Sequence, residues 1–280
     1  MLCRAVKRGE INLLGIGINA CMECSVASLD GFLTLEGMNV GYGIPLGIDT
    51  CATDFGGNPP YQMRLAPYAT RYKSNSDAES IVRFYRRLVA AATAPVEIVE
   101  IGYFQGFTAF MKSEADDISP KSGLELLCDK VSKIWAMAGK WDADGERENN
   151  FCRNPRARVA AEEFCRLCPV PVTFLGWEIG YGVLTGGRLA ENDHLRLALR
   201  DHGSEGGRHS WDPMTVLMAL MGDEHRAGYR VIRGKASVNS ETGQNYFLPA
   251  DDGLHAYVIK EKEDGFYRDL IDGMIESIAE

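Results

Sequence analysis

Carboxylate and amide side chains are concentrated in one short stretch, MAGKWDADGERENNFCRNPRA, at residues 137–157. Six of these side chains lie within one loop, namely Asp142, Asp144, Glu146, Glu148, Asn149 and Asn150. Such a run offers many oxygen acceptors and several amide donors, the groups that hold a polyhydroxylated ligand such as a sugar. A polar loop of this kind is more often simply solvated surface, so composition alone leaves both interpretations open.

A second stretch, GGRHSWDPMTVLMALMG at residues 206–222, places Asp212 and Pro213 at the start of a strongly apolar helix. An Asp in that place is most often an N-cap, which stabilises a helix by about 1 kcal/mol. Trp211, directly before it, could be a hydrophobic staple or a wall for a flat base. Both interpretations of Trp211 stay open at this stage.

Two pairs of cysteines have the spacing of zinc or redox sites, namely Cys21 with Cys24 and Cys165 with Cys168. The pairs are far apart in the sequence, no His lies near them, and EEFCRLCP resembles a helix end. All three features speak against zinc. An even cysteine count is weak support for disulfides in a chain this long, so reduced, part-buried thiols are the favoured interpretation.

The sequence contains no Walker loop, no G-x-G-x-x-G that opens a helix, no G-x-S-x-G and no H-E-x-x-H. Nucleotide cofactors, serine hydrolysis and zincin chemistry therefore have no support from motifs.

The composition is that of a globular chain of 280 residues, 45% hydrophobic and 25% charged, which predicts one large domain over residues 1–280. The net charge is -9 and the basic residues are scattered, so nucleic acid is not an expected partner. No apolar run is long enough for a membrane span, and no charged-then-apolar leader is visible in the given residues. We therefore expect a cytoplasmic protein with no membrane partner, and a leader upstream of Met1 is the alternative that stays open.

The polar segments are positioned by alternating helix and strand patterns. Helical spacing occupies residues 1–9, 24–38, 75–92, 122–130 and 156–168, and Ser76 or Asp77 is the expected N-cap of the third helix. Apolar runs typical of strands occupy residues 11–19, 42–49, 95–101, 131–138 and 170–176, and the first is expected to be buried on both faces. This alternation predicts an α/β fold, an open and mostly parallel sheet with helices on both faces.

Open α/β sheets bind ligands at the carboxyl ends of their strands. Three loops occupy that position: GYFQG after residue 101, KWDADGERENN after residue 139, and WEIGYG after residue 176. The second is the acid-rich and amide-rich loop described above.

Taken together, these segments resemble the inosine-uridine preferring nucleoside hydrolases and their bacterial relatives. The resemblance rests on EINLLGIGIN, VEIVEIGYFQGFTAFMKSEADD, MAGKWDADGERENNFCRNPRA, VPVTFLGWEIG and RHSWDPMTVLMAL, which occur in the family's order over nearly the whole chain. It implies an α/β open-sheet fold, Ca²⁺ in the active site, and hydrolysis of the N-glycosidic bond of ribonucleosides to base and ribose. It also implies a homo-oligomer, a dimer or a tetramer, and a place in nucleoside salvage.

The resemblance assigns roles to the metal ligands one by one. Asp212 matches the family's C-terminal metal-ligating Asp, and Gln105 falls where a backbone carbonyl reaches the metal. In the family most other ligands, and the Asp that deprotonates the attacking water, come from a D-x-D-x-x-x-D-D cluster ahead of the helix that MLCRAVKRGE resembles. We expect that cluster, and so the catalytic base, to lie upstream of Met1, and the Ca²⁺ site and hydrolysis to be impaired without it.

The same resemblance assigns the substrate contacts. Glu148 and Asn150 match a Glu-x-Asn pair that holds ribose hydroxyls, and Asp142 lies where the family usually has a ribose-binding Asn. Trp211 occupies the position of a His thought to assist the leaving base, so that route of protonation is not available. The changes at Asp142 and Trp211 leave a second hypothesis open, a non-catalytic relative that binds a nucleoside or a sugar. A structural α/β domain without a small-molecule site is a third.

Overall fold

The computed structural model describes residues 1–276, and its backbone contacts group the chain into two compact units. Unit 1 comprises Met1–Ile81, Gly182–Ser210 and the described part of Asp264–Glu280. Unit 2 comprises Val82–Tyr181 and Trp211–Glu263. The single domain expected over residues 1–280 stays a prediction.

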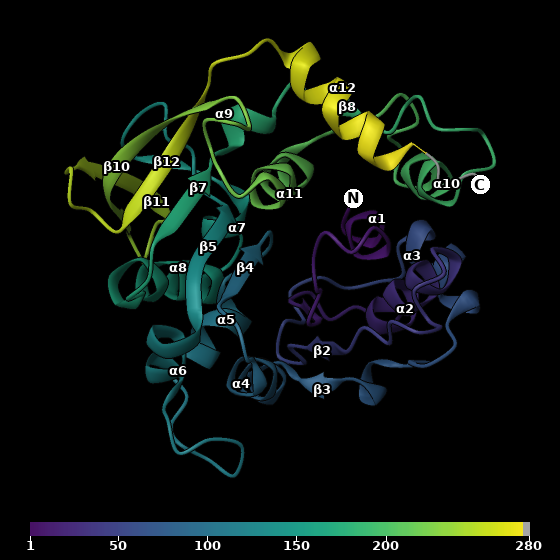
Figure 1. Ribbon diagram of the computed structural model, residues 1–280, viewed down its shortest axis with the longest axis horizontal. Helices are drawn as coiled ribbons and strands as arrows, with labels where there is room; N and C mark the ends of the chain where they lie inside the picture. The colour runs from purple at the N-terminus through teal and green to yellow at the C-terminus, as the bar shows by residue number, and fades with distance from the viewer. Residues whose placement is uncertain (277–280) are drawn as a thin grey trace. The chain divides into compact units, whose positions relative to one another are not determined.

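Unit 1 contains a parallel sheet in the order β1-β2-β3 and a short antiparallel pair of β8 with β9 (Figure 1). Its elements are α1 (Leu2–Lys7), β1 (Ile16–Ile18), α2 (Ser25–Leu35), β2 (Leu46–Ile48), α3 (Pro60–Leu65), η1 (Ala66–Tyr68), η2 (Asn75–Asp77), β3 (Glu79–Ser80), β8 (Leu184–Thr185), α10 (His194–Asp201), β9 (Arg208–His209) and α12 (Asp264–Ile275). The expectation that the first strand is buried on both faces is wrong. β1 is half-buried throughout because it is paired on one side only, at the edge of its sheet.

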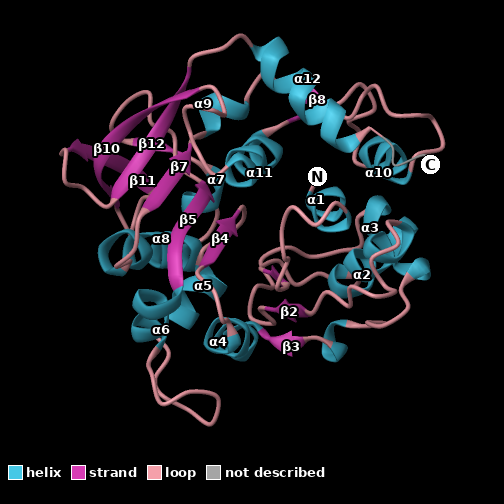
Figure 2. Cartoon of the chain, in the orientation of Figure 1, coloured by secondary structure: helices cyan, strands magenta, loops and turns pink. Residues whose placement is uncertain are grey.

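Unit 2 is built on a seven-stranded sheet in the order β4-β5-β7-β12-β10-β11-β6. Its elements are α4 (Ile81–Ala91, whose first residue is grouped with unit 1), β4 (Val96–Glu100), α5 (Gln105–Met111), α6 (Gly123–Lys130), β5 (Val131–Met137), β6 (Glu146–Arg147), α7 (Asn149–Cys152), α8 (Pro155–Leu167), β7 (Val172–Leu175), α9 (Trp177–Gly180), α11 (Trp211–Met221), β10 (Tyr229–Val238), β11 (Gln244–Pro249) and β12 (His255–Lys260). β4, β5, β7 and β12 pair in parallel, whereas β10, β11 and β6 are antiparallel additions. Figure 2 shows these strands against the helices of the unit.

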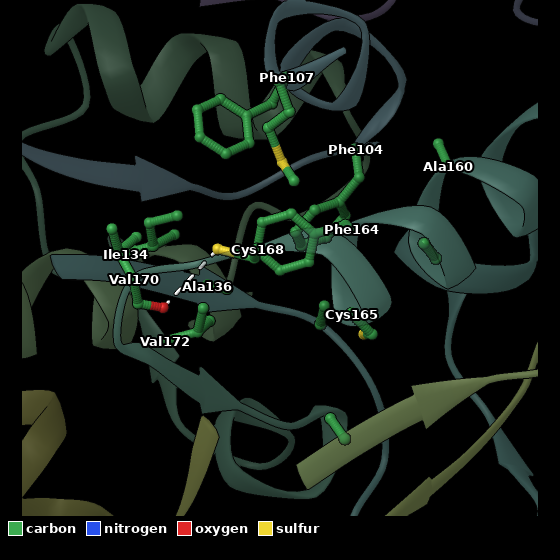
Figure 3. Close-up of a cluster of buried hydrophobic side chains, with 14 of the residues drawn as sticks. Phe104, Phe107, Ile134, Ala136, Ala160, Phe164, Cys165, Cys168, Val170 and Val172 are labelled. Atoms are coloured by element: carbon green, nitrogen blue, oxygen red, sulfur yellow. Dashed lines mark hydrogen bonds between the residues drawn. The ribbon is translucent and has the colours of Figure 1, made fainter. Parts of the chain in front are cut away.

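The two faces of this sheet are covered by different helices. Ile134 and Ala136 of β5 lie in one apolar core with Phe107 of α5 and Phe164 of α8 (Figure 3). Alternate strand residues point to the opposite face, and α11 packs on β4, β5 and β7. The predicted α/β fold, with a mostly parallel sheet and helices on both faces, is confirmed, and the carboxyl ends of β4, β5 and β7 are aligned at one edge.

The third predicted helix begins later than its sequence suggested. Residues 75–77 form a short 3-10 turn capped by Ser74, whose hydroxyl and the Asp77 carboxylate make a capping box. β3 follows, and the α-helix starts only at Ile81. Ser76 and Asp77 are therefore not its N-cap, because the polar residues first close a turn and a sheet edge.

All eight cysteines lie among the described residues and are free, as predicted. Cys168 ends α8 and its thiol donates to the Val170 carbonyl at 3.7 Å (Figure 3). Burial raises the pKa of Cys168 to about 11 and raises that of Cys165 further still. Both side chains are packing residues of the unit 2 core.

Within residues 1–276, no helix is both long enough and apolar enough to cross a lipid bilayer.

Candidate functional site

The residues predicted to bind substrate or metal all belong to unit 2. They are Gln105, Asp142, Glu148, Asn150, Trp211 and Asp212. Gln105 follows β4, the next three follow β5, and the last two open α11. Their roles stay predictions, but the chain places them around the strand ends where open α/β sheets bind ligands.

Glu148 is a buried carboxyl, 4% exposed, at the N-cap of α7. Its two oxygens each accept from the Asn150 backbone N–H at 2.9 Å, and Oε2 also accepts from the Gly139 N–H at 3.1 Å. Burial raises the pKa of Glu148 to about 7, and the negative charge of Asp212 adds to the increase. Glu148 forms no ion pair among residues 1–276, so its negative charge is stabilised by backbone dipoles alone.

Asn150 is also buried, and its side-chain amide is oriented by the end of β5. The amide nitrogen Nδ2 donates to the Met137 carbonyl at 2.9 Å and approaches the Met137 sulfur at 3.3 Å. The carbonyl oxygen Oδ1 has no hydrogen-bond partner among the described residues. Asn150 therefore offers an acceptor to a ligand, while its donor is used by the fold.

Asp142 lies in the loop that leaves β5, and its side chain is 51% exposed. Lys140 reaches both Asp142 Oδ1, at 3.3 Å, and Glu146 Oε2, at 3.0 Å. The two carboxylates raise the pKa of Lys140, so this ammonium stays charged. The Asp142 carboxylate is thus accessible to a ligand, and its orientation is fixed by the ion pair with Lys140.

Two residues that bond to the loop after β5, Asn245 and Glu178, were not among the predicted site residues. Asn245 of β11 is buried, accepts from the Lys140 N–H at 3.1 Å and donates to the Lys140 carbonyl at 2.7 Å. Glu178 of α9 accepts from the Trp141 N–H at 3.2 Å. Burial raises the pKa of Glu178 to about 7, and the charge of Asp142 adds to it. The sequence carried a signal for Glu178, since it is the acid of the WEIGYG loop, but none for Asn245.

Trp211 lies in a stack of three aromatic rings. Its indole stacks on Trp177 with ring centres 6.3 Å apart, and Trp177 stacks on Tyr181 at 4.5 Å. The Trp211 Nε1–H donates to the Trp177 carbonyl at 2.8 Å, so the orientation of the ring is fixed. Gly180 lies directly beneath it, because a Cβ there would stand 2.5 Å from the Trp211 backbone.

Asp212 lies in the first turn of α11, because the helix already begins at Trp211. The expectation that Asp212 is the N-cap is therefore wrong, although a carboxylate in the first turn still stabilises the helix through the helix dipole. Its charge raises the pKa of Glu148, which places the two carboxyl groups in the same electrostatic environment.

Gln105 is the first residue of α5, and its side chain is buried. Neither polar atom of its amide has a hydrogen-bond partner among residues 1–276. A carbonyl in the first turn of a helix accepts from the residue four positions on, so a metal would compete with the helix for the Gln105 oxygen. The residue's predicted role as a carbonyl ligand gains no support from this position.

Within residues 1–276, no group of three or more His, Cys, Asp or Glu side chains is arranged to hold a metal ion. Ca²⁺ requires six to eight oxygen ligands. The residues that the structure describes therefore do not fit a Ca²⁺ site, and the cofactor stays a prediction from the resemblance.

No model of a known protein family and no curated protein sequence matches this chain. Solved structures do match over 98% of its length. The inosine-uridine preferring nucleoside hydrolase from Bacillus anthracis has a TM-score of 0.64 at 12% identity, with 93% of that chain covered. The purine-preferring ribonucleoside hydrolase from Gardnerella vaginalis has 0.64 at 17% identity, with 94% covered.

A third match is the type III effector protein XopQ, in a structure complexed with adenosine diphosphate ribose. Its TM-score is 0.62 at 14% identity, and 86% of that chain is covered. At such low identity these likenesses establish architecture and not activity. They show that this chain has the fold of the nucleoside hydrolases.

Proposed function

We propose that the chain binds a ribonucleoside at the carboxyl edge of the unit 2 sheet and hydrolyses its N-glycosidic bond. The observation that carries the proposal is the pair formed by Glu148 and Asn150. Both are buried, both are fixed by backbone contacts at the end of β5, and Asn150 presents an unused acceptor. Side chains fixed before a ligand arrives lose little entropy on binding it.

The chemistry of the reaction fits a site rich in carboxylates. Cleavage of an N-glycosidic bond passes through a sugar with oxocarbenium character, so positive charge develops on the ribose. Glu148, Asp212 and Asp142 place negative charge or oxygen acceptors where such a sugar would lie. Interactions that strengthen as this charge develops lower the barrier, whereas equal binding of ground and transition states does not.

Two groups needed for turnover are not assigned by this arrangement. The described residues do not gather a Ca²⁺ ligand set, and no general base is identified among them. The Trp211 Nε1–H is already used by the Trp177 carbonyl, so Trp211 is not available to protonate the departing base. These observations favour a second candidate function, a relative that binds a nucleoside or sugar without cleaving it.

One experiment separates the two functions. The full chain is incubated with inosine and with uridine, with and without added Ca²⁺, and free base is measured by chromatography. Binding is followed in parallel by tryptophan fluorescence, because Trp141, Trp177 and Trp211 surround the site. Adenosine diphosphate ribose is included because XopQ has been solved with it.

Release of base supports hydrolysis, and a fluorescence change that saturates without release supports the binding function. Glu162→Gln is the matched control, since Glu162 pairs with Arg166 on the surface of α8. Neither release nor saturable binding with any of these compounds would contradict both candidate functions.

A further inference from the structure

The turn between β5 and Asp142 is held by hydrogen bonds at Gly139, Lys140 and Trp141. Gly139 accepts from the Trp177 N–H at 2.8 Å and donates to Glu148 at 3.1 Å. Lys140 exchanges two hydrogen bonds with Asn245, and the Trp141 N–H donates to Glu178 at 3.2 Å. Three side chains from three separate segments thus hold three consecutive residues.

The conformation of this turn also requires glycine at its first position. Gly139 has a φ of +79°, in the left-handed region, and a Cβ there would stand 2.4 Å from the indole of Trp141. Trp141 packs between Phe174 and Tyr257, and its Nε1–H donates to the Ala138 carbonyl at 3.0 Å. The turn therefore closes on its own aromatic side chain.

Glu178 is the member of this set that bonds to the last residue of the turn, Trp141. Among residues 1–276, its Oε2 alone has a partner outside α9, the Trp141 N–H. The carboxyl forms no ion pair among residues 1–276, although Lys140 and Asp142 both act on it electrostatically. A half-buried carboxyl without a paired cation is costly for stability, so a packing role alone does not account for it.

We propose that Glu178 is a positioning residue for the candidate sugar site, where it fixes the Lys140–Trp141 peptide group, one residue before Asp142. The inference rests on the proposed ribonucleoside binding. Asp142 itself is exposed, and its carboxylate forms an ion pair with Lys140. Glu178 fixes the backbone that precedes Asp142. The two interactions together orient the oxygens of the Asp142 carboxylate in one direction.

The raised pKa of Glu178 supports this role. At neutral pH the carboxyl holds its proton part of the time, which limits its repulsion of Asp142. Its carbonyl oxygen accepts from the Trp141 N–H in either protonation state. An amide of the same shape would do the same, which makes Glu178→Gln the conservative variant.

The test is a double-mutant cycle on the full chain, with inosine as the ligand and intrinsic fluorescence as the readout. Glu178→Gln should bind inosine within about twofold of the wild type, whereas Glu178→Leu should bind about tenfold more weakly, since it loses the acceptor. Asp142→Ala should weaken binding as well. The double variant Asp142→Ala/Glu178→Leu should bind no more weakly than Asp142→Ala alone, because Glu178 acts through Asp142.

Hydrogen exchange provides a readout that needs no ligand. The 138–142 segment should exchange faster in Glu178→Leu and at the wild-type rate in Glu178→Gln. Additive losses in the cycle, or unchanged exchange in Glu178→Leu, would overturn the positioning role while leaving the proposed function intact. A wild-type chain that binds no nucleoside would overturn the proposed function itself, and the role of Glu178 in it.

Discussion

Unit 2 holds buried charge in two contrasting ways. Arg86 of α4 is 1% exposed and bonds to the loop at residues 113–121. Its guanidinium donates to the Asp116 carboxylate at 2.7 Å, and to the Ser119 and Lys121 carbonyls. This pairing lowers the pKa of Asp116 to about 2. The turn at residues 138–141 bonds instead to two carboxyl groups, Glu148 and Glu178, which accept from its backbone N–H groups and have no paired cation among residues 1–276. Burial raises the pKa of both carboxyl groups to about 7.

The contrast separates a structural polar cluster from a candidate binding site. Pairing Arg86 with a carboxylate and two carbonyls compensates for the loss of water, so the loop is held without the need for a ligand. The carboxyl groups near β5 and β7 accept only from backbone N–H groups and have no paired cation among residues 1–276. Such an arrangement lowers stability and is typical of functional sites. Pairing, rather than burial, distinguishes the two regions.

The largest expected effect comes from breaking the paired cluster. Arg86→Met should lower the free energy of unfolding by about 3 kcal/mol, because it leaves buried carbonyls and Asp116 without their donor. Chemical denaturation followed by circular dichroism measures the change. Binding of inosine, measured where the variant is folded, should be unchanged.

The matched control is Arg83→Met. Arg83 lies on α4, like Arg86, but it forms an exposed ion pair with Asp117. That variant should change the free energy of unfolding by less than about 1 kcal/mol. Equal losses in the two variants would remove the distinction between the buried cluster and ordinary surface pairs.

A smaller effect should appear in the pH dependence of stability, with opposite signs for the two regions. The pKa of Asp116 is lowered in the folded state, so its contribution is present above about pH 4 and is lost as the pH falls toward 2. The pKa of Glu178 is raised, so the folded state binds the extra proton and stability falls as the pH rises from about 4.5 to 7.

Thermal melts across this range, for the wild type, Asp116→Asn and Glu178→Gln, measure both trends. Asp116→Asn should flatten the profile below pH 4. Glu178→Gln should make it less steep between 4.5 and 7, and the slope that remains there comes from Glu148, whose pKa is also raised to about 7. A Glu178→Gln profile parallel to that of the wild type in the upper range would show that burial does not raise the pKa of this carboxyl.

Much of the α/β core of unit 2 could be predicted from local pattern. β4, β5 and β7 are short apolar runs between helices with clear amphipathic spacing, and the structure confirms them. The antiparallel strands β10 to β12 were not predicted, because the alternation of polar and apolar residues that indicates a half-buried strand is broken in RVIRGKASV at Val231 and Ile232. Such strands are specified by pairing with their neighbours rather than by their own composition.

The site could be predicted only in part, for a related reason. The acid-rich loop after β5 is contiguous in sequence, so its composition indicated it, and the resemblance to the nucleoside hydrolases then assigned Asp142, Glu148 and Asn150 within it. Glu178 and Asn245 act on that loop from α9 and β11, and their contacts depend on long-range folding. Arg86 was part of a predicted helix, but nothing in its local sequence indicates that it is buried.

The most direct test of the central claim is a titration of the full chain with inosine, comparing the wild type with Glu148→Ala by intrinsic tryptophan fluorescence. The proposed sugar site predicts saturable binding by the wild type and an affinity lower by roughly ten- to a hundredfold in Glu148→Ala. Equal affinities in the two proteins, with both folded, would contradict the assignment of the sugar to the end of β5.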